Sequence, residues 1–119
     1  MKHKFFLNPA GTIEIHIIGD VSVADMKHIG EELMTLITIL EDKGEKANIL
    51  VDLSEGGNTE ALALKLSVII AKDLSFHKIA CYQTKYTAVL EKIIQLSGQE
   101  HKLWMFNNRS EAEAWLTEG

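Results

Sequence analysis

The residues with the clearest chemical potential follow one hydrophobic segment, Ala47 to Leu53, in the middle of the chain. The candidate binding residues at its end are Asp52, Ser54, Gly56, Gly57, Asn58 and Thr59. If a helix starts near Asn58 or Thr59, its N-terminal N–H groups and the Gly-Gly backbone can bind a phosphate or an anionic headgroup. The structural alternative is an ordinary N-cap, preceded by glycines that permit a tight turn. Asp52 could act as an acid or base, or could hold N–H groups of the loop.

The chain shows no residue pattern typical of catalysis, of a resident metal or of a nucleotide. Its five histidines share no metal-ligand spacing, and they are His3, His16, His28, His77 and His101. A serine nucleophile would need a base and an oxyanion hole, and Gly-x-Ser-x-Gly is absent. Gly56-Gly57 lacks the further glycines and the Lys-Ser/Thr of a P-loop. We therefore expect a protein that is not an enzyme and has no catalytic residue, metal ligand or cofactor.

Length and composition indicate one domain over residues 1–119. The net charge is −5 and no basic stripe exists, which argues against a nucleic-acid partner. The single cysteine, Cys81, lies in an apolar run and is predicted to be a buried, inert thiol in a reducing compartment. No segment approaches the roughly 20 apolar residues of a transmembrane helix. The start of the chain also lacks the apolar core of a signal peptide, so we expect a cytoplasmic protein.

Hydrophobic periodicity defines the elements that must position the polar loop. The predicted strands are Lys2–Leu7, Thr12–Ile18, Ala47–Leu53, Lys78–Gln83 and Lys102–Phe106. Helices are predicted from Ser22 to Lys43-Gly44, from Asn58 or Thr59 to Leu74, from Lys85 to Ser97, and from Ser110 onward. The order β-β-α-β-α-β-α-β-α predicts an α/β fold with a mixed, mostly parallel sheet of about five strands and four helices. The short Asn8–Gly11 turn makes the first strand antiparallel, at or near an edge.

Details of the pattern support these elements. Ser22 with Asp25, and Ser110 with Glu113, resemble capping boxes at helix starts. In the strand Thr12–Ile18 isoleucines alternate with polar residues such as His16, which predicts one buried and one wetter face.

The helix that ends at Leu74 has more apolar residues than one narrow stripe needs. Part of its apolar surface, at Leu64, Ile70 or Leu74, is therefore left over for another contact. The sequence leaves three candidates open: the neighbouring helix, a subunit partner or a lipophilic ligand.

Nearly the whole chain, from Thr12 to Leu116, resembles the STAS superfamily in element order and apolar pattern. The resemblance rests on Gly19-Asp20-Val21 before a long helix, on Ile49 to Ser54 before a polar loop, and on the closing segment Ser110 to Leu116. It is closest to small stand-alone SpoIIAA-like proteins, also described as STAS/SEC14-like. Antagonists of this family carry a phosphorylatable serine in an Asp-Ser-Ser-Gly motif, which is missing here. Thr59 is the nearest hydroxyl and Ser54 the next.

The resemblance implies a non-catalytic binding module that recognises a protein partner or a lipophilic small molecule. The contact would be made by the loop and helix after the central strand, from Ser54 to Leu66, with Leu62 included. A homodimer and peripheral contact with a membrane are compatible with it. The alternative is an anti-sigma-factor-antagonist-type regulator, phosphorylated at Thr59 or Ser54, where added negative charge would order or break a docking surface.

Overall fold

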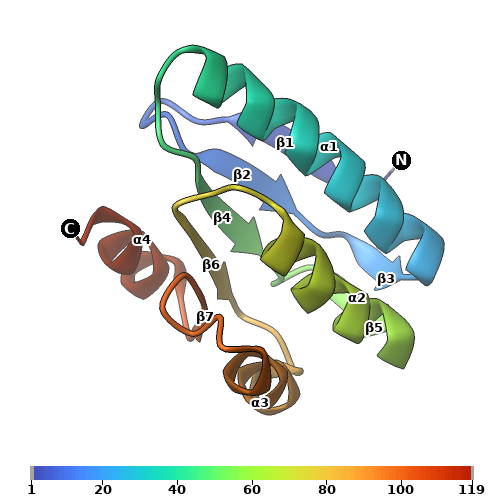
Figure 1. Cartoon of the computed structure of the whole chain (residues 1–119). Coiled ribbons are helices and arrows are strands. Elements are labelled where there is room, and N and C mark those ends of the chain that lie inside the picture. The colour runs from blue at the N-terminus through green and yellow to red at the C-terminus, as the bar shows by residue number, and fades with distance from the viewer. Residues whose placement is uncertain (1, 119) are drawn as a thin grey trace.

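A computed structural model describes residues 2–118, in which helices cover both faces of a five-stranded sheet (Figure 1). The sheet order is β1-β2-β4-β6-β7, and its strands are β1 (Lys4–Leu7), β2 (Ile13–His16), β4 (Asn48–Asp52), β6 (Lys78–Tyr82) and β7 (Leu103–Phe106). The helices are α1 (Val23–Asp42), α2 (Ala61–Asp73), α3 (Thr87–Ser97) and α4 (Arg109–Thr117). β1 pairs antiparallel with β2 at the edge and the other pairs are parallel. The predicted fold class and sheet are confirmed.

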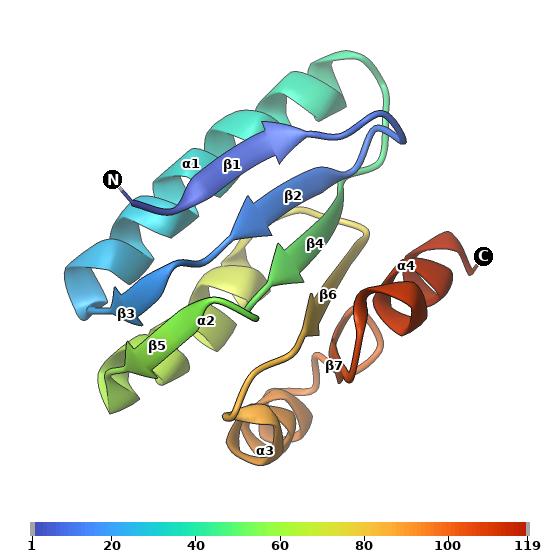
Figure 2. The same ribbon diagram turned by 180° about the vertical axis from the view of Figure 1, so that it is seen from behind.

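Side-chain alternation along the strands gives the sheet two distinct faces. On one face, Ile13, Ile49, Ile79 and Leu103 lie in register across four strands and pack under α1, α2 and α3. On the other face, a smaller cluster packs under α4, with Leu50, Ala80, Tyr82, Ala112 and Leu116 as its buried members. Figure 2, seen from behind, shows the sheet in front of α1 and α2. The predicted alternation is confirmed, but the face expected to be wetter is partly covered by α4.

The prediction that a helix starts near Asn58 or Thr59, in the loop after β4, is wrong. The segment Gly56–Thr59 is instead strand β5, which pairs in parallel with β3 (Gly19–Val21). This pairing satisfies backbone groups that a helix start would leave free, so it outweighs the local turn composition. Gly57 permits the close approach, because a Cβ there would lie 2.4 Å from Asp20 Oδ1. Helix α2 therefore begins at Ala61.

One of the two predicted helix caps is confirmed and the other is wrong. Ser22 and Asp25 form a reciprocal capping box at the start of α1. At α4 the cap is Asn108, whose Oδ1 accepts from the backbone N–H of Glu111 at 2.9 Å. Asparagine is at least as good a cap as serine, so α4 starts before Ser110.

Within residues 2–118 no helix is both long enough and apolar enough to cross a membrane.

Candidate binding site

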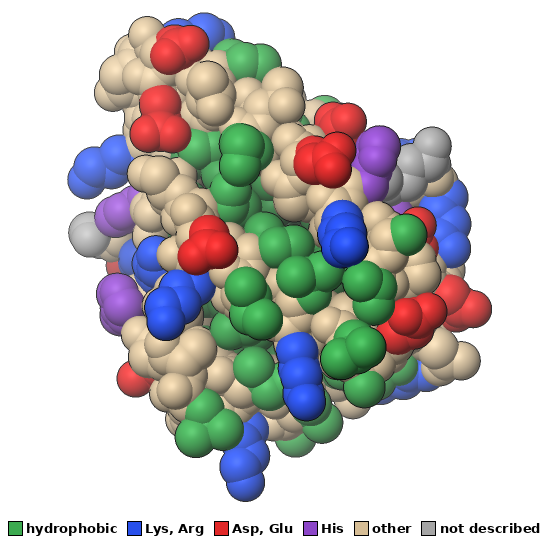
Figure 3. Space-filling model, turned by 45° about the vertical axis from the view of Figure 1, so that its right-hand side comes forward, with side chains coloured by type: hydrophobic (Ala, Val, Ile, Leu, Met, Phe, Trp, Pro, Cys, Tyr) green, Lys and Arg blue, Asp and Glu red, His purple; other side chains and the backbone are tan. Residues whose placement is uncertain are grey.

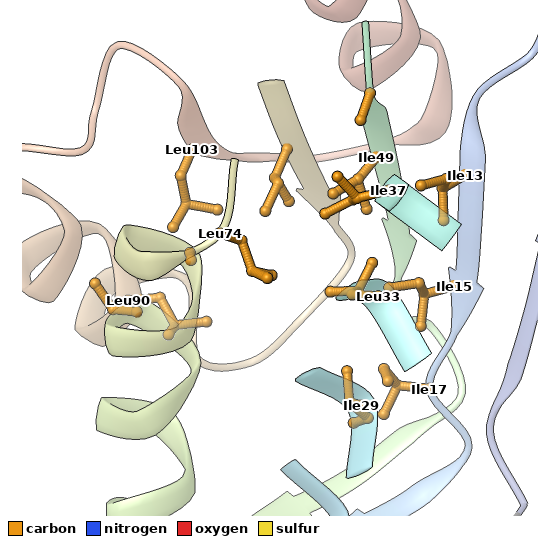
Figure 4. Close-up of a cluster of buried hydrophobic side chains, with 14 of the residues drawn as sticks. Ile13, Ile15, Ile17, Ile29, Leu33, Ile37, Ile49, Leu74, Leu90 and Leu103 are labelled. Atoms are coloured by element: carbon orange, nitrogen blue, oxygen red, sulfur yellow. The ribbon is translucent and has the colours of Figure 1, made fainter. Parts of the chain in front are cut away.

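The face of the sheet under α1, α2 and α3 encloses a cavity of about 310 Å³. Its lining is mostly apolar, with the polar side chains mainly in the loops after β4 and β6. In Figure 4, Leu74, Leu90 and Leu103 lie on one side of the core, and Ile15, Ile17 and Leu33 lie on the other. Further lining residues are Val21, Met26, Ile29, Val51, Leu53, Leu64, Val68, Ile70, Ala71, Ile79, Cys81, Ile94 and Met105.

The exposure of the two central strands shows that the cavity reaches the sheet itself. Leu50 and Ala80 point toward α4 and are at most 1% exposed. Their chain neighbours Val51 and Cys81 point toward the cavity and are only half-buried, although they lie in equally central positions. A close-packed interior would cover such residues completely. This part of the core is therefore incompletely filled by the protein's own side chains.

The mouth of the cavity lies at the carboxyl ends of β4 and β6, where open α/β sheets commonly bind ligands. The loop after β4 contributes Ser54, Gly56, Gly57 and Thr59, and the loop after β6 contributes Gln83, Thr84, Lys85 and Tyr86. Two hydrogen bonds join the loops. The backbone N–H of Thr59 donates to the Tyr86 hydroxyl at 2.9 Å, and Lys85 Nζ donates to Asn58 Oδ1 at 2.5 Å.

The sequence left two alternatives for the backbone of the first loop, an anion site and an ordinary N-cap after a tight turn, and the hydrogen bonds of this loop do not favour the anion site. The N–H of Gly56 donates to the Leu53 carbonyl, that of Asn58 to Asp20 Oδ1, and that of Thr59 to Tyr86. These donors already have partners inside the protein. An anion would have to break those bonds before the same N–H groups could hold it.

The structure places most of the predicted site residues at or in the cavity. Ser54, Gly56, Gly57 and Thr59 line the cavity mouth, and Asn58 lies beside it as the acceptor for Lys85. The side chains of Leu64, Ile70 and Leu74, expected to be left over for another contact, all line the cavity.

Asp52 and Leu62 do not line the cavity. Asp52 points to the α4 side of the sheet and accepts from both the N–H and the hydroxyl of Ser54, at 2.9 and 2.6 Å. It therefore holds the loop, as the structural alternative predicted. Leu62 is 67% exposed on the outer surface of α2.

Cys81 lines the cavity as an un-ionised thiol. Burial raises its pKa to about 12, because the surrounding apolar side chains disfavour the thiolate. The prediction of an inert thiol is consistent with this environment, since only the thiolate is an effective nucleophile.

On the opposite face of the sheet, three side chains surround the carboxylate of Glu14, a residue that is 4% exposed. Arg109 binds it through both terminal nitrogens, Asn8 Nδ2 donates to it at 2.9 Å, and His16 Nε2 lies 3.0 Å from it. Burial by itself would raise the pKa of Glu14. The hydrogen bonds and the guanidinium charge outweigh burial and lower this pKa to about 2.

This Glu14 cluster, consisting of Glu14, Arg109, Asn8 and His16, is internally paired through the Glu14 carboxylate. Asp52 extends it, with Oδ2 3.8 Å from His16 Nδ1. Among residues 2–118, no group of three or more histidine, cysteine or acidic side chains is arranged to hold a metal ion.

Apolar side chains also reach the outer surface. Figure 3 shows them gathered between isolated charged residues on one side of the molecule. Large hydrophobic residues that are more than half exposed are Met34, Leu62, Ile69, Val89 and Leu96. They lie on the solvent sides of α1, α2 and α3, and none of them lines the cavity.

The second half of the mouth, Gln83 to Tyr86, was missed by the sequence analysis. A usable signal existed, because these residues follow a predicted parallel strand next to the one that ends at Asp52. The carboxyl ends of neighbouring parallel strands meet at one edge of the sheet.

Comparison with known proteins identifies a family and two solved structures with a similar fold. The family model described as SpoIIAA-like matches residues 12–117. An anti-sigma factor antagonist, SpoIIAA in its unphosphorylated form, superimposes with a TM-score of 0.62 at 13% identity, over 94% of this chain and 93% of that one. A DUF3478 protein with a SpoIIAA-like fold, from Shewanella loihica PV-4, gives a TM-score of 0.59 at 14% identity, over 96% and 93%. No protein of curated function matches. Since the family match covers nearly the whole chain and the STAS resemblance is thereby confirmed, the chain belongs to the SpoIIAA-like family.

Proposed function

We infer that this protein is a non-catalytic binding module that holds a lipophilic small molecule in the cavity between α2 and the sheet. The observation that supports this function is the apolar volume of about 310 Å³ beneath three helices. Ligand pockets typically begin at about 300 Å³ and are lined mainly by hydrophobic side chains. Unfilled apolar volume lowers stability, so a chain that keeps it forgoes packing that larger side chains would supply.

The size of the cavity indicates the size of the ligand. An apolar cavity of about 150 Å³ stays dry and accepts one benzene molecule. The volume found here is about twice that, so a molecule of roughly ten to twelve carbon atoms fits it. One end of such a molecule would reach the polar mouth formed by the two loops.

Binding of 1-decanol, measured by isothermal titration calorimetry, tests this function. We expect saturable binding by the wild type and a loss of at least tenfold in affinity for Ser67→Phe. Ser67 lines the cavity from α2, and its hydroxyl donates to the carbonyl of Leu64 in the preceding turn, so a phenyl ring there would occupy the ligand's volume. Lys65→Phe is the matched control, because Lys65 is exposed on the same helix and does not line the cavity.

Two outcomes would contradict the proposal. The first is that the wild type, stripped of bound lipid on a hydrophobic resin, takes up no decanol. The second is that Ser67→Phe binds it as tightly as Lys65→Phe does. Native mass spectrometry before stripping adds an independent readout, since a retained ligand appears as a mass shift that the Ser67→Phe protein lacks.

A second candidate function is a regulator that acts on a protein partner and is switched by phosphorylation at Ser54 or Thr59. It is supported by the shared fold with the anti-sigma factor antagonist and by the exposure of Ser54 at the mouth of the cavity. A phosphate on Ser54 would stand beside the Asp52 carboxylate that now accepts its hydroxyl, and repulsion would open this loop. The exposed apolar side chains of α2 and α3 offer a docking surface that this opening would alter.

Phosphate incorporation from labelled ATP, with a kinase of the anti-sigma type, tests the second function. Wild type, Ser54→Ala and Thr59→Ala are compared. Incorporation that one alanine variant abolishes supports the switch, whereas no incorporation in the wild type contradicts it. The expected cytoplasmic location and the homodimer stay predictions, and cell fractionation and light scattering test them.

A further inference from the structure

One charged side chain stands at the cavity. Among the described residues that line it, Lys85 alone carries a charge, and the rest are apolar or neutral polar. The protein as a whole is acidic, with a net charge of −5, so a cation at the opening of its apolar cavity is not a consequence of overall composition. An ammonium group beside an apolar volume favours a molecule with a hydrocarbon body and an anionic end.

The ammonium group of Lys85 is held at the mouth but is not neutralised. It donates to Asn58 Oδ1 at 2.5 Å and lies 5.5 Å from the centre of the Tyr86 ring. No carboxylate of residues 2–118 lies within 4.0 Å of it. A lysine ammonium has three donors, so two stay available after the bond to Asn58.

The neighbouring residue Gln83 supports a functional role for this loop. It is the one non-glycine residue with positive φ among those described, at 60°. Such a conformation is unfavourable for a side-chain-bearing residue and recurs at ligand-binding segments. Here it occurs where the chain leaves β6 and turns along the cavity mouth toward Lys85.

We propose that the lipophilic ligand carries a carboxylate, which Lys85 binds at the mouth while the hydrocarbon chain fills the cavity. The ligand class is then a medium-chain fatty acid of about ten carbons. This proposal rests on the proposed function, because it assigns the polar end of the same ligand. The ordinary pKa of a carboxylic acid keeps such a ligand ionised at neutral pH, so the contact is a charge-assisted hydrogen bond.

The test uses two probes of equal chain length, decanoic acid and 1-decanol, in calorimetric titrations near neutral pH, below the concentrations at which they form micelles. We expect Lys85→Gln to lose about tenfold in affinity for decanoic acid, the scale of one charge-assisted hydrogen bond. Its affinity for decanol should stay within about twofold of the wild type. Lys85→Arg should keep most of the affinity for decanoic acid. Lys65→Gln is the control, since it removes the same charge from an exposed position away from the cavity.

The outcomes separate this proposal from the function on which it rests. If both probes bind the wild type and Lys85→Gln equally, or if only decanol binds, the carboxylate assignment fails and the lipophilic binding function stands. If neither probe binds any variant, both fail. Salt gives a readout on the unmodified protein: raising NaCl from about 20 mM to about 500 mM should weaken binding of decanoic acid and not that of decanol. Equal salt dependence for both probes would also overturn the assignment.

Discussion

On the α4 side of the sheet, the buried carboxylate of Glu14 is paired with Arg109, Asn8 and His16, whereas on the side of α1, α2 and α3 apolar groups surround an open volume. The same strands supply both surfaces. In β2, Glu14 points to one side and is bound by Arg109, while its neighbour Ile15 points to the other and lines the cavity.

The contrast separates two reasons for unusual features in a protein interior. A buried carboxylate often indicates a functional site, but the charge of Glu14 is stabilised by Asn8, His16 and Arg109. The apolar side has no unusual residue type, yet it lacks the packing that a purely structural core would have. We therefore propose a structural role for the Glu14 cluster and a binding role for the cavity, and substitutions at the two places should have opposite effects on stability.

Replacing Arg109 by alanine should have the largest effect. Glu14 would be left buried without its cation, and breaking a buried ion pair in this way strongly destabilises proteins. We expect a loss of about 3 kcal/mol in the free energy of unfolding, at the low end of the usual range because Arg109 is partly open to water. Urea denaturation at neutral pH measures it. Glu113→Ala, which removes the exposed partner of Arg109, should cost under about 0.5 kcal/mol. Equal costs for the two variants would contradict a structural role of the Glu14 cluster.

Acid should lower the stability that the Glu14 cluster gives to the folded protein. The pKa of Glu14 is about 2 in the folded protein and 4.5 ordinarily, so folding favours the ionised form. The stabilisation is complete above pH 4.5 and is lost as the pH falls toward 2. After allowance for screening by solvent, ionised Glu14 contributes about 2 kcal/mol to the free energy of unfolding. The unfolding free energy of Glu14→Gln should fall less steeply than that of the wild type over this interval. Parallel curves would show that other carboxylates carry the acid sensitivity.

Filling the cavity should raise the stability of the protein. Ser67→Phe adds apolar volume where none is present, and cavity-filling substitutions commonly add about 1 kcal/mol of stability. For a chain of this size we expect the melting temperature to rise by roughly 4 °C, measured by calorimetry without ligand. Lys65→Phe on the outer surface of α2 should change it by much less. A destabilised Ser67→Phe protein would indicate that this part of the core is already full.

The regular elements were predictable because their signals are local. The alternation of β2 and the capping box of Ser22 with Asp25 depend on residues close together in sequence. The pairing of β3 with β5 is not local: it brings Asp20 to the N–H of Asn58, and a Gly-Gly-Asn-Thr segment has little intrinsic preference for a strand. The prediction of a helix start at Asn58 or Thr59 failed for this reason.

The site was only half predictable. The carboxyl end of a buried strand pointed to the loop that contains Ser54 and Thr59, and both residues line the cavity. The cavity itself is a volume left between side chains of several elements, and no residue pattern encodes such a volume. Long-range partners are equally invisible: Glu14 and Arg109 are 95 positions apart, so the sequence suggested a wetter strand face where the structure has a buried ion pair.

The smallest expected effect concerns Leu62, which the sequence placed in the binding site and the structure places outside the cavity, 67% exposed. Leu62→Ser should change the unfolding free energy by less than about 0.5 kcal/mol, because an exposed position loses little apolar contact. Its affinity for decanol should equal that of the wild type. If the affinity instead falls as far as in Ser67→Phe, the ligand lies on the outer surface that Leu62 shares with Ile69, and the assignment of binding to the interior is wrong. If Leu62→Ser binds decanol as tightly as the wild type and Ser67→Phe loses affinity, the ligand lies in the cavity under α1, α2 and α3.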